Sequence, residues 1–354
     1  MNLLLTGRTG IAVTILALVC LLCTGPASLR AEEKYVLKFA TLAPTGTTIM
    51  SLLEEWAQAV ETRSKGRLSF KFYPGGIQGD ETDVLRKMRF GTLHGGAFSG
   101  YGIGHIYSPA RVLELPFLFN NHAEIDYVRD HFMADFEQGY RENGYELLGW
   151  MEIGFVYFFS RDPITTFDDL KKKRIWLWQG DPLGQAFFDA SGITPVPLSI
   201  IDVFTSLSTG LIDTVYTTPL AAIALQWFTK TSYVTNLPMA NAIGSLVVTR
   251  KFYQKLPQDL QKLLLSTGRE TGRRLIVAAR IDNAKSIEVL RSRGLQFVLD
   301  PAEVDAAELS SLRDEAAGKL MSSGYIPGDI LNRAVHLLES FRAGMPVPPP
   351  PRMP

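Results

Sequence analysis

The α/β character of this chain is set near its start, where residues 35–90 read YVLKFATLAPTGTTIMSLLEEWAQAVETRSKGRLSFKFYPGGIQGDETDVLRKMRF. Residues 35–41 and 68–73 alternate apolar and polar side chains and are rich in β-formers, so they predict two strands. Between them, apolar residues recur at helical spacing from Met50 to Val60, and a second helix is expected around Met88. The order β-α-β-α predicts parallel strands joined by crossover helices.

The same alternation returns later in the chain. We predict strands at Val156–Phe159, Arg174–Trp178 and Asp213–Tyr216, and helices at Phe167–Leu170, Leu183–Ala190, Ile200–Thr209, Gln258–Arg293, Val304–Met321 and Ile330–Phe341. The helix from Gln258 is interrupted only by Gly268 and Gly272, and it is long enough to brace two units. Two α/β units are therefore predicted.

The composition is that of a folded, globular protein. The chain has 354 residues, of which 46% are hydrophobic and 20% charged, enough for one large or two medium domains. Its 36 Lys and Arg residues match 36 Asp and Glu residues. Because the net charge is zero, no overall field favours nucleic acid or an anionic membrane surface. We expect no nucleic-acid partner.

The N-terminus has the pattern of an export signal. Arg8 precedes an apolar run from Ile11 to Leu22, and small residues follow, as in a secretory signal peptide. The run is about a dozen residues long, shorter than the roughly 20 that a membrane-spanning helix needs. We expect residues 1–31 to be a signal peptide, with cleavage after Ala27 or Ala31, and the mature protein to be periplasmic.

Two features of the chain ends limit its chemistry. Both cysteines, Cys20 and Cys23, lie in the expected signal peptide, so the mature chain is expected to hold no disulfide, thiol nucleophile or thiolate metal site. At the other end, residues 344–354 are rich in proline and cannot pack as helix or sheet. We predict a disordered, extended tail there.

Few residues indicate catalysis. The five histidines are scattered, and no two stand at the i, i+4 spacing of a helical metal site. No Gly-x-Ser-x-Gly elbow occurs. The glycines between Gly95 and Gly104 precede no clear helix start, so we interpret them as loop residues rather than as a phosphate site. We expect no catalytic residue, no metal site and no cofactor.

Trp176 and Trp178 are separated by one residue, so on a strand they point to the same face. Packing in the core is one interpretation of this pair. However, both residues stand at the end of a strand that leads into Gln179-Gly180-Asp181-Pro182, and open α/β sheets bind ligands at such places. A ligand-binding role for the pair therefore stays open.

A series of short motifs in fixed order resembles one family of receptors. The motifs are SKGRL at residues 64–68, YPGGIQGDE at 73–81, RFGTL at 89–93, ELPFLF at 114–119, LGW at 148–150, DLK at 169–171, PVPL at 195–198, DVFT at 202–205 and TGLID at 209–213. From Lys34 to about Asn283 the chain is similar to the extracytoplasmic solute receptors of tripartite ATP-independent periplasmic (TRAP) transporters, of the dicarboxylate-receptor (DctP) type.

This resemblance implies an α/β, two-lobed periplasmic-binding-protein fold. Each lobe would hold a mixed sheet, strands would cross at a hinge, a long helix would brace both lobes, and the lobes would close on the solute by hinge bending. The lobes would comprise residues 32–153 plus about 242–281, and residues 154–241 plus about 282–343. The receptor would deliver a small-molecule solute to TRAP membrane permease subunits.

Two positions depart from the family pattern. Where the family has Gly-x-Arg, this chain ends the motif with Val156, and where a Lys-x-Arg strand supplies the main carboxylate-binding arginine, it has Trp176. The family's Asp-Gly-Gln-x-Asn-Pro becomes DTVYTTP at residues 213–219. Arg174 lies two positions away, so we do not transfer the role to it. A buried carboxylate without a guanidinium partner costs several kcal/mol.

The expected site is therefore apolar and aromatic. We predict these ligand-binding residues: Trp176, Trp178, Val156, Phe155, Gln179, Tyr216, Thr217, Thr218 and Ile200. An apolar or amphipathic solute would gain about 25 cal/mol for each Å² of apolar area that it buries there. The chain is similar in this respect to family members that work beside a tetratricopeptide-repeat periplasmic protein and are linked to hydrophobic ligands, so such a protein is a candidate partner.

Two alternatives stay open. The receptor could bind an organic acid without the usual arginine, through Arg161, Arg174 or a bound metal. The second alternative is an exported enzyme on the same scaffold, because a fold does not fix a function.

Overall fold

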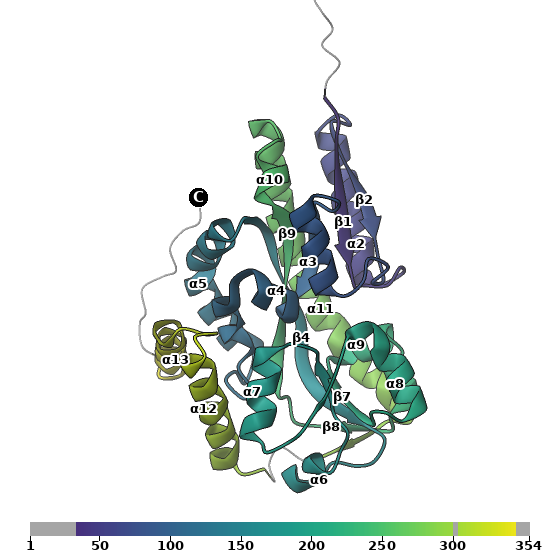
Figure 1. The fold of residues 1–354 in the computed structure, drawn as a ribbon, viewed down its shortest axis with the longest axis vertical. Helices are drawn as coiled ribbons and strands as arrows, with labels where there is room; N and C mark the ends of the chain where they lie inside the picture. Colours follow the sequence, from purple (N-terminus) through teal and green to yellow (C-terminus); the bar gives the residue numbers. More distant parts are fainter. Residues whose placement is uncertain (1–32, 300–303, 345–354) are drawn as a thin grey trace, which may run out of the picture. The chain divides into compact units, whose positions relative to one another are not determined.

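The computed structural model describes residues 33–299 and 304–344 (Figure 1). The predicted signal peptide and, apart from Gly344, the predicted tail lie outside these residues. The strands are β1 (Tyr35–Thr41), β2 (Leu68–Tyr73), β3 (Gly95–Ser99), β4 (Tyr145–Ser160), β5 (Trp176–Trp178), β6 (Val196–Leu198), β7 (Thr214–Thr217), β8 (Tyr233–Thr235), β9 (Ala240–Thr249) and β10 (Gln296–Val298).

Helices of very different length connect these strands. They are α2 (Thr48–Arg63), α3 (Glu81–Phe90), α4 (Gly100–Tyr107), α5 (His122–Glu142), α6 (Phe167–Lys171), α7 (Pro182–Ala190), α8 (Val203–Thr209), α9 (Pro219–Ala224), α10 (Arg250–Tyr253), α11 (Gln258–Ser292), α12 (Ala306–Ser322) and α13 (Gly328–Arg342), with 3-10 turns η1 (Ser108–Glu114), η2 (Ile200–Asp202) and η3 (Trp227–Lys230). None of the helices in the described residues has the length and apolarity to cross a bilayer.

A mixed sheet extends through the molecule in the order β10-β8-β4-β9-β3-β1-β2, and β7 also pairs with β4. β1 is parallel to β2 and β3, whereas β9 is antiparallel to β3 and β4. β4 is antiparallel to β7 and β8, and β5 pairs with β6 in a small parallel sheet of their own. This arrangement confirms the predicted α/β class and the mixed sheet.

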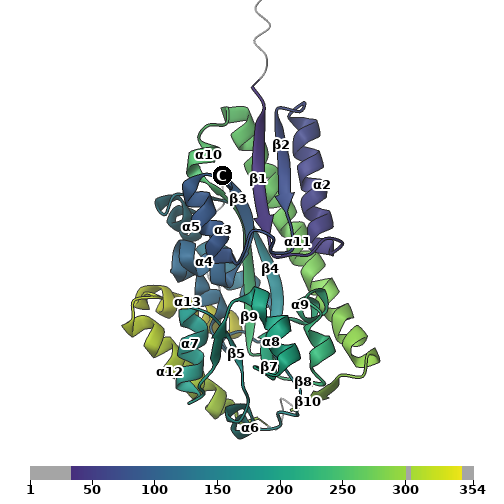
Figure 2. The same ribbon diagram turned by 45° about the vertical axis from the view of Figure 1, so that its right-hand side comes forward.

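The crossing strands β4 and β9 join two parts of the molecule (Figures 1 and 2). We call residues 35–114, with β1–β3 and α2–α4, the first lobe. Residues 167–235, with β5–β8 and α6–α9, are the second lobe. Both definitions stay within the predicted lobe boundaries, which themselves remain a prediction.

The predicted bracing helix is α11, which packs closely on β4 (Figure 2). Glycines on both elements permit this approach. A Cβ on Gly149 of β4 would lie 2.4 Å from the carbonyl oxygen of Gly268, and a Cβ on Gly272 would lie 2.4 Å from that of Trp150. The two glycines that interrupt the helical pattern of the sequence are therefore the residues that let the helix pack against the crossing strand.

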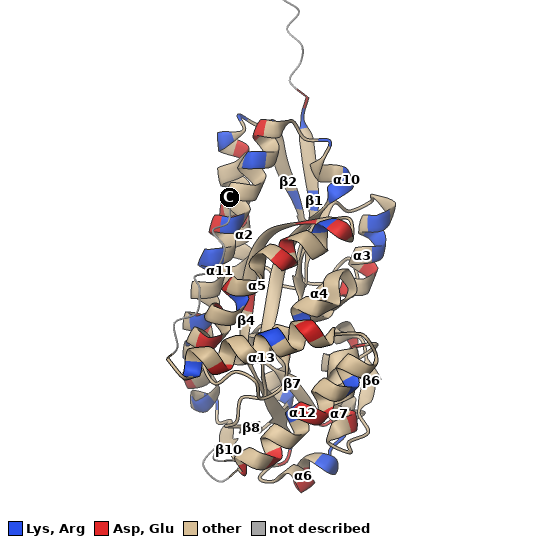
Figure 3. Cartoon of the chain, turned by 90° about the vertical axis from the view of Figure 1, so that its left-hand side faces the viewer, with Lys and Arg blue, Asp and Glu red and all other residues tan. Residues whose placement is uncertain are grey.

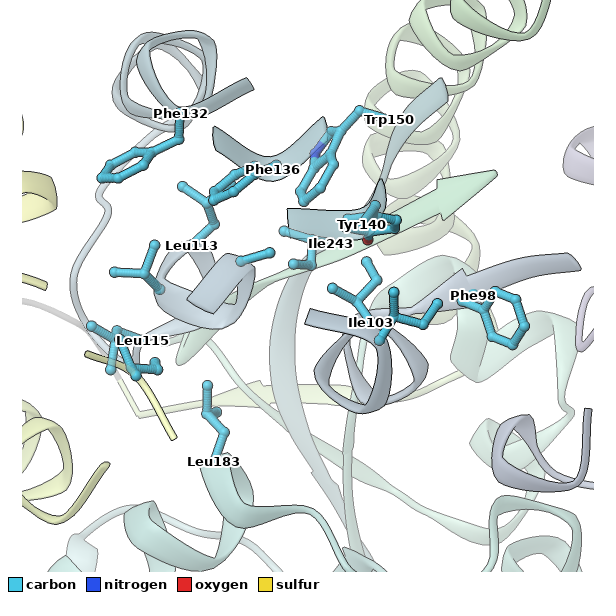
Figure 4. Packing of buried hydrophobic residues seen from close by; sticks show 14 of the residues in the cluster. Phe98, Ile103, Leu113, Leu115, Phe132, Phe136, Tyr140, Trp150, Leu183 and Ile243 are labelled. Atoms are coloured by element: carbon cyan, nitrogen blue, oxygen red, sulfur yellow. The ribbon is translucent and has the colours of Figure 1, made fainter. Parts of the chain in front are cut away.

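Buried aromatic side chains from α5 and the crossing strand β4 belong to the largest core cluster (Figure 4). Phe136 stacks on Phe132 and on Trp150, with ring centroids 5.5 and 5.4 Å apart. Tyr140 lies beside them and donates a hydrogen bond to Ser245 of β9 at 3.2 Å. On the outside, charges of both signs are interspersed over the helices (Figure 3).

One sequence prediction of local structure is wrong, and another strand is longer than predicted. The glycine run from Gly95 to Gly104 is not a loop but strand β3 followed by helix α4. Glycine is needed there because a Cβ on Gly100 would lie 2.0 Å from the Glu114 carboxylate and one on Gly102 would lie 2.5 Å from that of Glu81. In addition, the strand predicted at Val156–Phe159 is only the end of the 16-residue β4, because its apolar faces are covered along the whole length.

Candidate functional site

A cavity of about 230 Å³ lies where both lobes meet the crossing strands. The first lobe contributes the loop after β1 and the start of α4, and the second lobe contributes β5, α7 and the residues around α9. β4 provides Met151, Ile153 and Val156, and residues 239–242 of β9 and the turn before it complete the wall. The site is thus built from segments that are far apart in sequence.

Seven of the nine predicted ligand-binding residues line this cavity. They are Trp176, Trp178, Val156, Tyr216, Thr217, Thr218 and Ile200. Phe155 and Gln179 do not. Phe155 points to the opposite face of β4 from Val156 and packs against the ring of His122, at a centroid distance of 5.0 Å. Gln179 is exposed. Contact of any of the nine with a solute remains a prediction.

Trp176 is part of the wall and of the core at the same time. It is 2% exposed, and its ring stacks on Tyr216 at 5.0 Å and meets Trp227 edge-on at 5.3 Å. Its Nε1 donates a hydrogen bond to the carbonyl oxygen of Leu198 at 2.9 Å. The indole therefore has its polar atom satisfied by the protein and offers an apolar surface to the cavity.

Two other predicted residues, Thr218 and Trp178, also use their polar groups within the protein. Thr218 is 1% exposed, and its hydroxyl caps α9 by accepting a hydrogen bond from the backbone of Ala221 at 3.2 Å. The Nε1–H group of Trp178 donates hydrogen bonds to both carboxylate oxygens of Asp80, at 3.0 and 3.1 Å. These groups are held by protein partners and do not stand free for a solute.

Four charged residues of the wall were missed by the sequence analysis, and three of them form one cluster. Arg111, Glu114 and Asp181 are 4%, 6% and 5% exposed. Arg111 donates from Nη1 and Nη2 to the two oxygens of Asp181, at 2.8 and 3.2 Å, and from Nε to Glu114. The second oxygen of Glu114 accepts a hydrogen bond from the backbone of Ile243 at 2.8 Å. One guanidinium is thus enclosed by two carboxylates.

The pKa values of this group follow from burial and pairing. Burial works against the charge of Arg111, but Asp181 and Glu114 outweigh it and hold the pKa of Arg111 well above its usual value. Burial raises the pKa of Glu114, and the guanidinium of Arg111 offsets only part of the shift. The three side chains together carry no excess positive charge.

Glu81 is a further buried acid in the wall. It is 3% exposed, and it accepts hydrogen bonds from the backbone of Ser99 at 2.7 Å, from the hydroxyl of Ser99 at 2.9 Å and from the backbone of Gly102 at 2.6 Å. Burial raises the pKa of Glu81 to about 7, although these donors oppose the shift.

Asn241 of β9 also belongs to the wall. It is 1% exposed, and within the described residues neither its Oδ1 nor its Nδ2 has a hydrogen-bond partner. Buried amides in folded proteins are normally paired with protein or water. This side chain is therefore a free donor and acceptor at the cavity.

The arginines considered as substitutes lie elsewhere. Arg174 is exposed and forms an ion pair with Asp213 at 3.0 Å, and the guanidinium of Arg161 donates to the carbonyl oxygen of Leu207. Neither residue lines the cavity. In the described part of the chain, no group of three or more His, Cys, Asp or Glu side chains is placed to hold a metal ion.

The sequence does contain a signal for the buried charges. Glu114 opens the ELPFLF motif, Arg111 stands one helical turn before it, and Asp181 stands three residues after Trp178. Arg111, however, is far in sequence from the two substituted family positions, Val156 and Trp176. A charged residue inside an otherwise apolar stretch, such as SPARVLELPF at residues 108–117, is the pattern that indicates a buried charge.

Known proteins resemble this chain along most of its length. The family model described as "Bacterial extracellular solute-binding protein, family 7" (DctP) matches residues 39–314. The 2,3-diketo-L-gulonate-binding periplasmic protein YiaO of Escherichia coli (strain K12) is 25% identical over 249 residues, which are 68% of this chain and 74% of YiaO.

Two solved structures share the fold. A TRAP periplasmic solute binding protein from Pseudomonas putida F1 with bound D-glucuronate has a TM-score of 0.75 at 23% identity, covering 85% of this chain and 96% of that one. The sugar acid binding protein DctPAm from Advenella mimigardefordensis strain DPN7T, in complex with galactonate, has a TM-score of 0.79 at 17% identity, covering 87% and 99%. The predicted two-lobed fold is confirmed by these structures.

Proposed function

Because the chain belongs to family 7 of the bacterial extracellular solute-binding proteins, we propose that its cavity encloses one small apolar or amphipathic solute. The protein is a periplasmic receptor of the TRAP type, not an enzyme, and its partners are a small-molecule solute and a TRAP membrane permease. The chemistry of the solute is what the proposal adds.

The observation that carries the proposal is the charge of the wall. Among the described residues that line the cavity, Arg111 alone is basic, and Asp181 and Glu114 occupy its guanidinium. Two like charges about 5 Å apart repel by about 3 kcal/mol at an effective dielectric constant of about 20. A carboxylate that entered beside these two acids would meet repulsion without a free cation to offset it.

The rest of the wall favours apolar surface. Trp176, Tyr216, Phe187 and Phe188 face the cavity together with Met151, and none of these side chains carries a charge. Each Å² of apolar solute surface that leaves water here contributes about 25 cal/mol. Aromatic walls with a few polar groups are typical of sites for small organic ligands.

The free amide of Asn241 supports an amphipathic rather than a purely apolar solute. Leaving a buried polar group without a partner costs about 1–3 kcal/mol. A solute with one neutral donor or acceptor, such as a hydroxyl, carbonyl or amide, would remove this cost when it bonds to Asn241. The apolar part of the solute would then lie against the tryptophan side of the cavity.

A tetratricopeptide-repeat periplasmic protein remains a proposed additional partner. Its support is the resemblance of the two substituted positions, Val156 and Trp176, to receptors that are linked to hydrophobic ligands. Pull-down of the tagged mature receptor from its own host, followed by mass spectrometry, tests for it. Recovery of permease subunits without any repeat protein would speak against this partner.

A second candidate is an organic acid held by Arg111. It is favoured by the position of this guanidinium in the cavity wall and by the bound D-glucuronate and galactonate of the two similar structures. In this case the solute carboxylate would have to replace Asp181 as a partner of Arg111. The two candidates therefore differ in what Arg111 binds.

Native mass spectrometry of receptor purified from its host distinguishes the candidates by the mass of the retained solute. We expect a neutral apolar or amphipathic compound, and we expect D-glucuronate and galactonate to give no heat in calorimetric titration. Arg174→Ala, which removes a surface arginine, is the matched control for Arg111→Met. A retained small acid whose binding is lost in Arg111→Met and kept in Arg174→Ala would disprove the proposal.

A further inference from the structure

Asp80, at the start of α3 in the first lobe, receives hydrogen bonds from three groups of the second lobe. Trp178 Nε1 donates to both carboxylate oxygens at 3.0 and 3.1 Å, and the backbone of Ile200 donates at 3.2 Å. The hydroxyl of Ser199 donates as well. The same carboxylate caps α3 by accepting from the backbone of Glu81 at 2.6 Å. One side chain, 6% exposed, thus connects the two lobes.

Two neighbouring contacts also cross between the lobes. The ring of Tyr101 stacks on Trp178 with centroids 4.5 Å apart and planes inclined by 20°, and its hydroxyl donates to the carbonyl oxygen of Gln179 at 2.8 Å. Further along the same side, Arg111 of the first lobe binds Asp181 of the second. All of these contacts join protein atoms to protein atoms, so none of them requires a solute.

A buried carboxylate is stable only when donors surround it. In an open receptor, water would hydrate Asp80. In the closed receptor, the indole N–H, the hydroxyl and the backbone N–H replace that water, and the helix start adds its own donor. Closing therefore exchanges one set of hydrogen bonds on Asp80 for another and adds the stacking of Tyr101 on Trp178.

We propose that Asp80 is a latch that holds the two lobes closed in the absence of solute, and that Trp178 acts mainly as its donor. This inference goes beyond the proposed function, because it concerns the equilibrium between open and closed lobes and not the chemistry of the solute. The latch is formed in the empty and in the filled closed state alike. It slows entry and exit of the solute, and it changes the affinity less than the rates.

The test is the lifetime of the closed state in the full mature receptor without solute, measured by single-molecule energy transfer. Dyes are attached through Arg86→Cys in the first lobe and Thr205→Cys in the second, both exposed positions. Trp178→Phe keeps a ring that can stack on Tyr101 and removes the N–H that binds Asp80. Because hydrogen bonds to charged groups are among the strong ones, we expect the closed lifetime to fall at least about tenfold.

The matched control is Trp56→Phe. It also removes a buried indole hydrogen bond, from Nε1 to the hydroxyl of Thr267 at 2.9 Å, but this bond joins α2 to α11 and does not reach the second lobe. We expect the closed lifetime of this variant to equal that of the unchanged receptor. Adding Ser199→Ala to Trp178→Phe removes a further donor and should shorten the lifetime again, with circular dichroism confirming that each variant is folded.

Two results would overturn the latch. One is an unchanged receptor that shows no closed state without solute, and the other is equal closed lifetimes in Trp178→Phe and Trp56→Phe. Neither result bears on the solute, which native mass spectrometry identifies separately. An acid found in the cavity would end the proposal on solute chemistry and leave the latch intact.

Discussion

Measuring both folding stability and solute affinity in Trp176→Ala shows whether this side chain only packs in the cavity wall or also contacts the solute. Trp176 is 2% exposed, stacks on Tyr216, meets Trp227 edge-on and donates to the carbonyl oxygen of Leu198. Alanine removes all of these contacts. A loss of affinity in this variant therefore shows solute contact by Trp176 only when the loss of stability is measured in parallel.

The structure indicates which effect is larger. Truncating a buried aromatic side chain costs about 3–5 kcal/mol of folding free energy, and leaving the carbonyl of Leu198 without its donor adds about 1 kcal/mol. Loss of the solute contact should cost about 1–3 kcal/mol of binding free energy. We therefore expect the free energy of unfolding to fall by about 4–6 kcal/mol, more than the affinity does. Trp176→Phe, which keeps a ring, should lose much less of both.

Urea unfolding followed by circular dichroism measures the stability, because the fluorescence of the removed tryptophan is no longer comparable. Calorimetric titration with the solute identified from the host measures the affinity at a temperature where both variants are folded. A variant that loses stability as calculated but binds the solute with unchanged affinity would show that Trp176 only packs. The aromatic wall would then play no part in recognition.

Three further changes probe the charges and the amide. Arg174→Ala should leave the affinity unchanged and cost less than about 1 kcal/mol of stability, because this exposed residue pairs with Asp213 at the surface; a large loss in calorimetric titration would contradict this. Glu81→Gln should flatten the pH dependence of stability. Burial raises the pKa of Glu81 from 4.5 to about 7, so the folded state keeps a proton that the unfolded chain loses. The free energy of unfolding therefore falls by up to about 3 kcal/mol as the pH rises from 4.5 to 7. If urea unfolding at pH 5 and pH 7 gives the same change in this free energy for Glu81→Gln and for the unchanged protein, the assignment is refuted. Asn241→Leu should weaken binding of an amphipathic solute by about 1 kcal/mol without lowering stability, because the amide has no partner in the described residues; unchanged heat of titration would exclude this contact.

Local patterns of the sequence predicted the elements whose burial follows a simple period. α2 and α11 lie close to the predicted ranges because one apolar face repeats at helical spacing. The glycine run that became β3 and α4 was misinterpreted because its glycines are required by side chains far away, the carboxylates of Glu81 and Glu114. No local pattern contains that information.

The candidate site, too, was predictable only where local patterns determine it. Its apolar wall was predictable, because β5 and β7 end at the place where such sheets bind ligands. Its polar side was not, since Arg111 and Asp181 are 70 residues apart and Asp80 and Trp178 are 98 residues apart. Pairings over such distances depend on how the lobes meet, and a single sequence gives no measure of that.

The two candidate solutes make different demands on Asp181. If an acid bound to Arg111, its carboxylate would take the place of Asp181, and Asp181 would be left buried without its cation. Breaking a buried ion pair in this way costs about 3–5 kcal/mol, so an acid gains from Arg111 only if Asp181 moves out to water. Asp181 also caps α7 through the backbone of Leu183, which ties it to the helix start. An acid-binding receptor would therefore have to move the start of α7 on binding, whereas a receptor for a neutral solute closes with this ion pair intact.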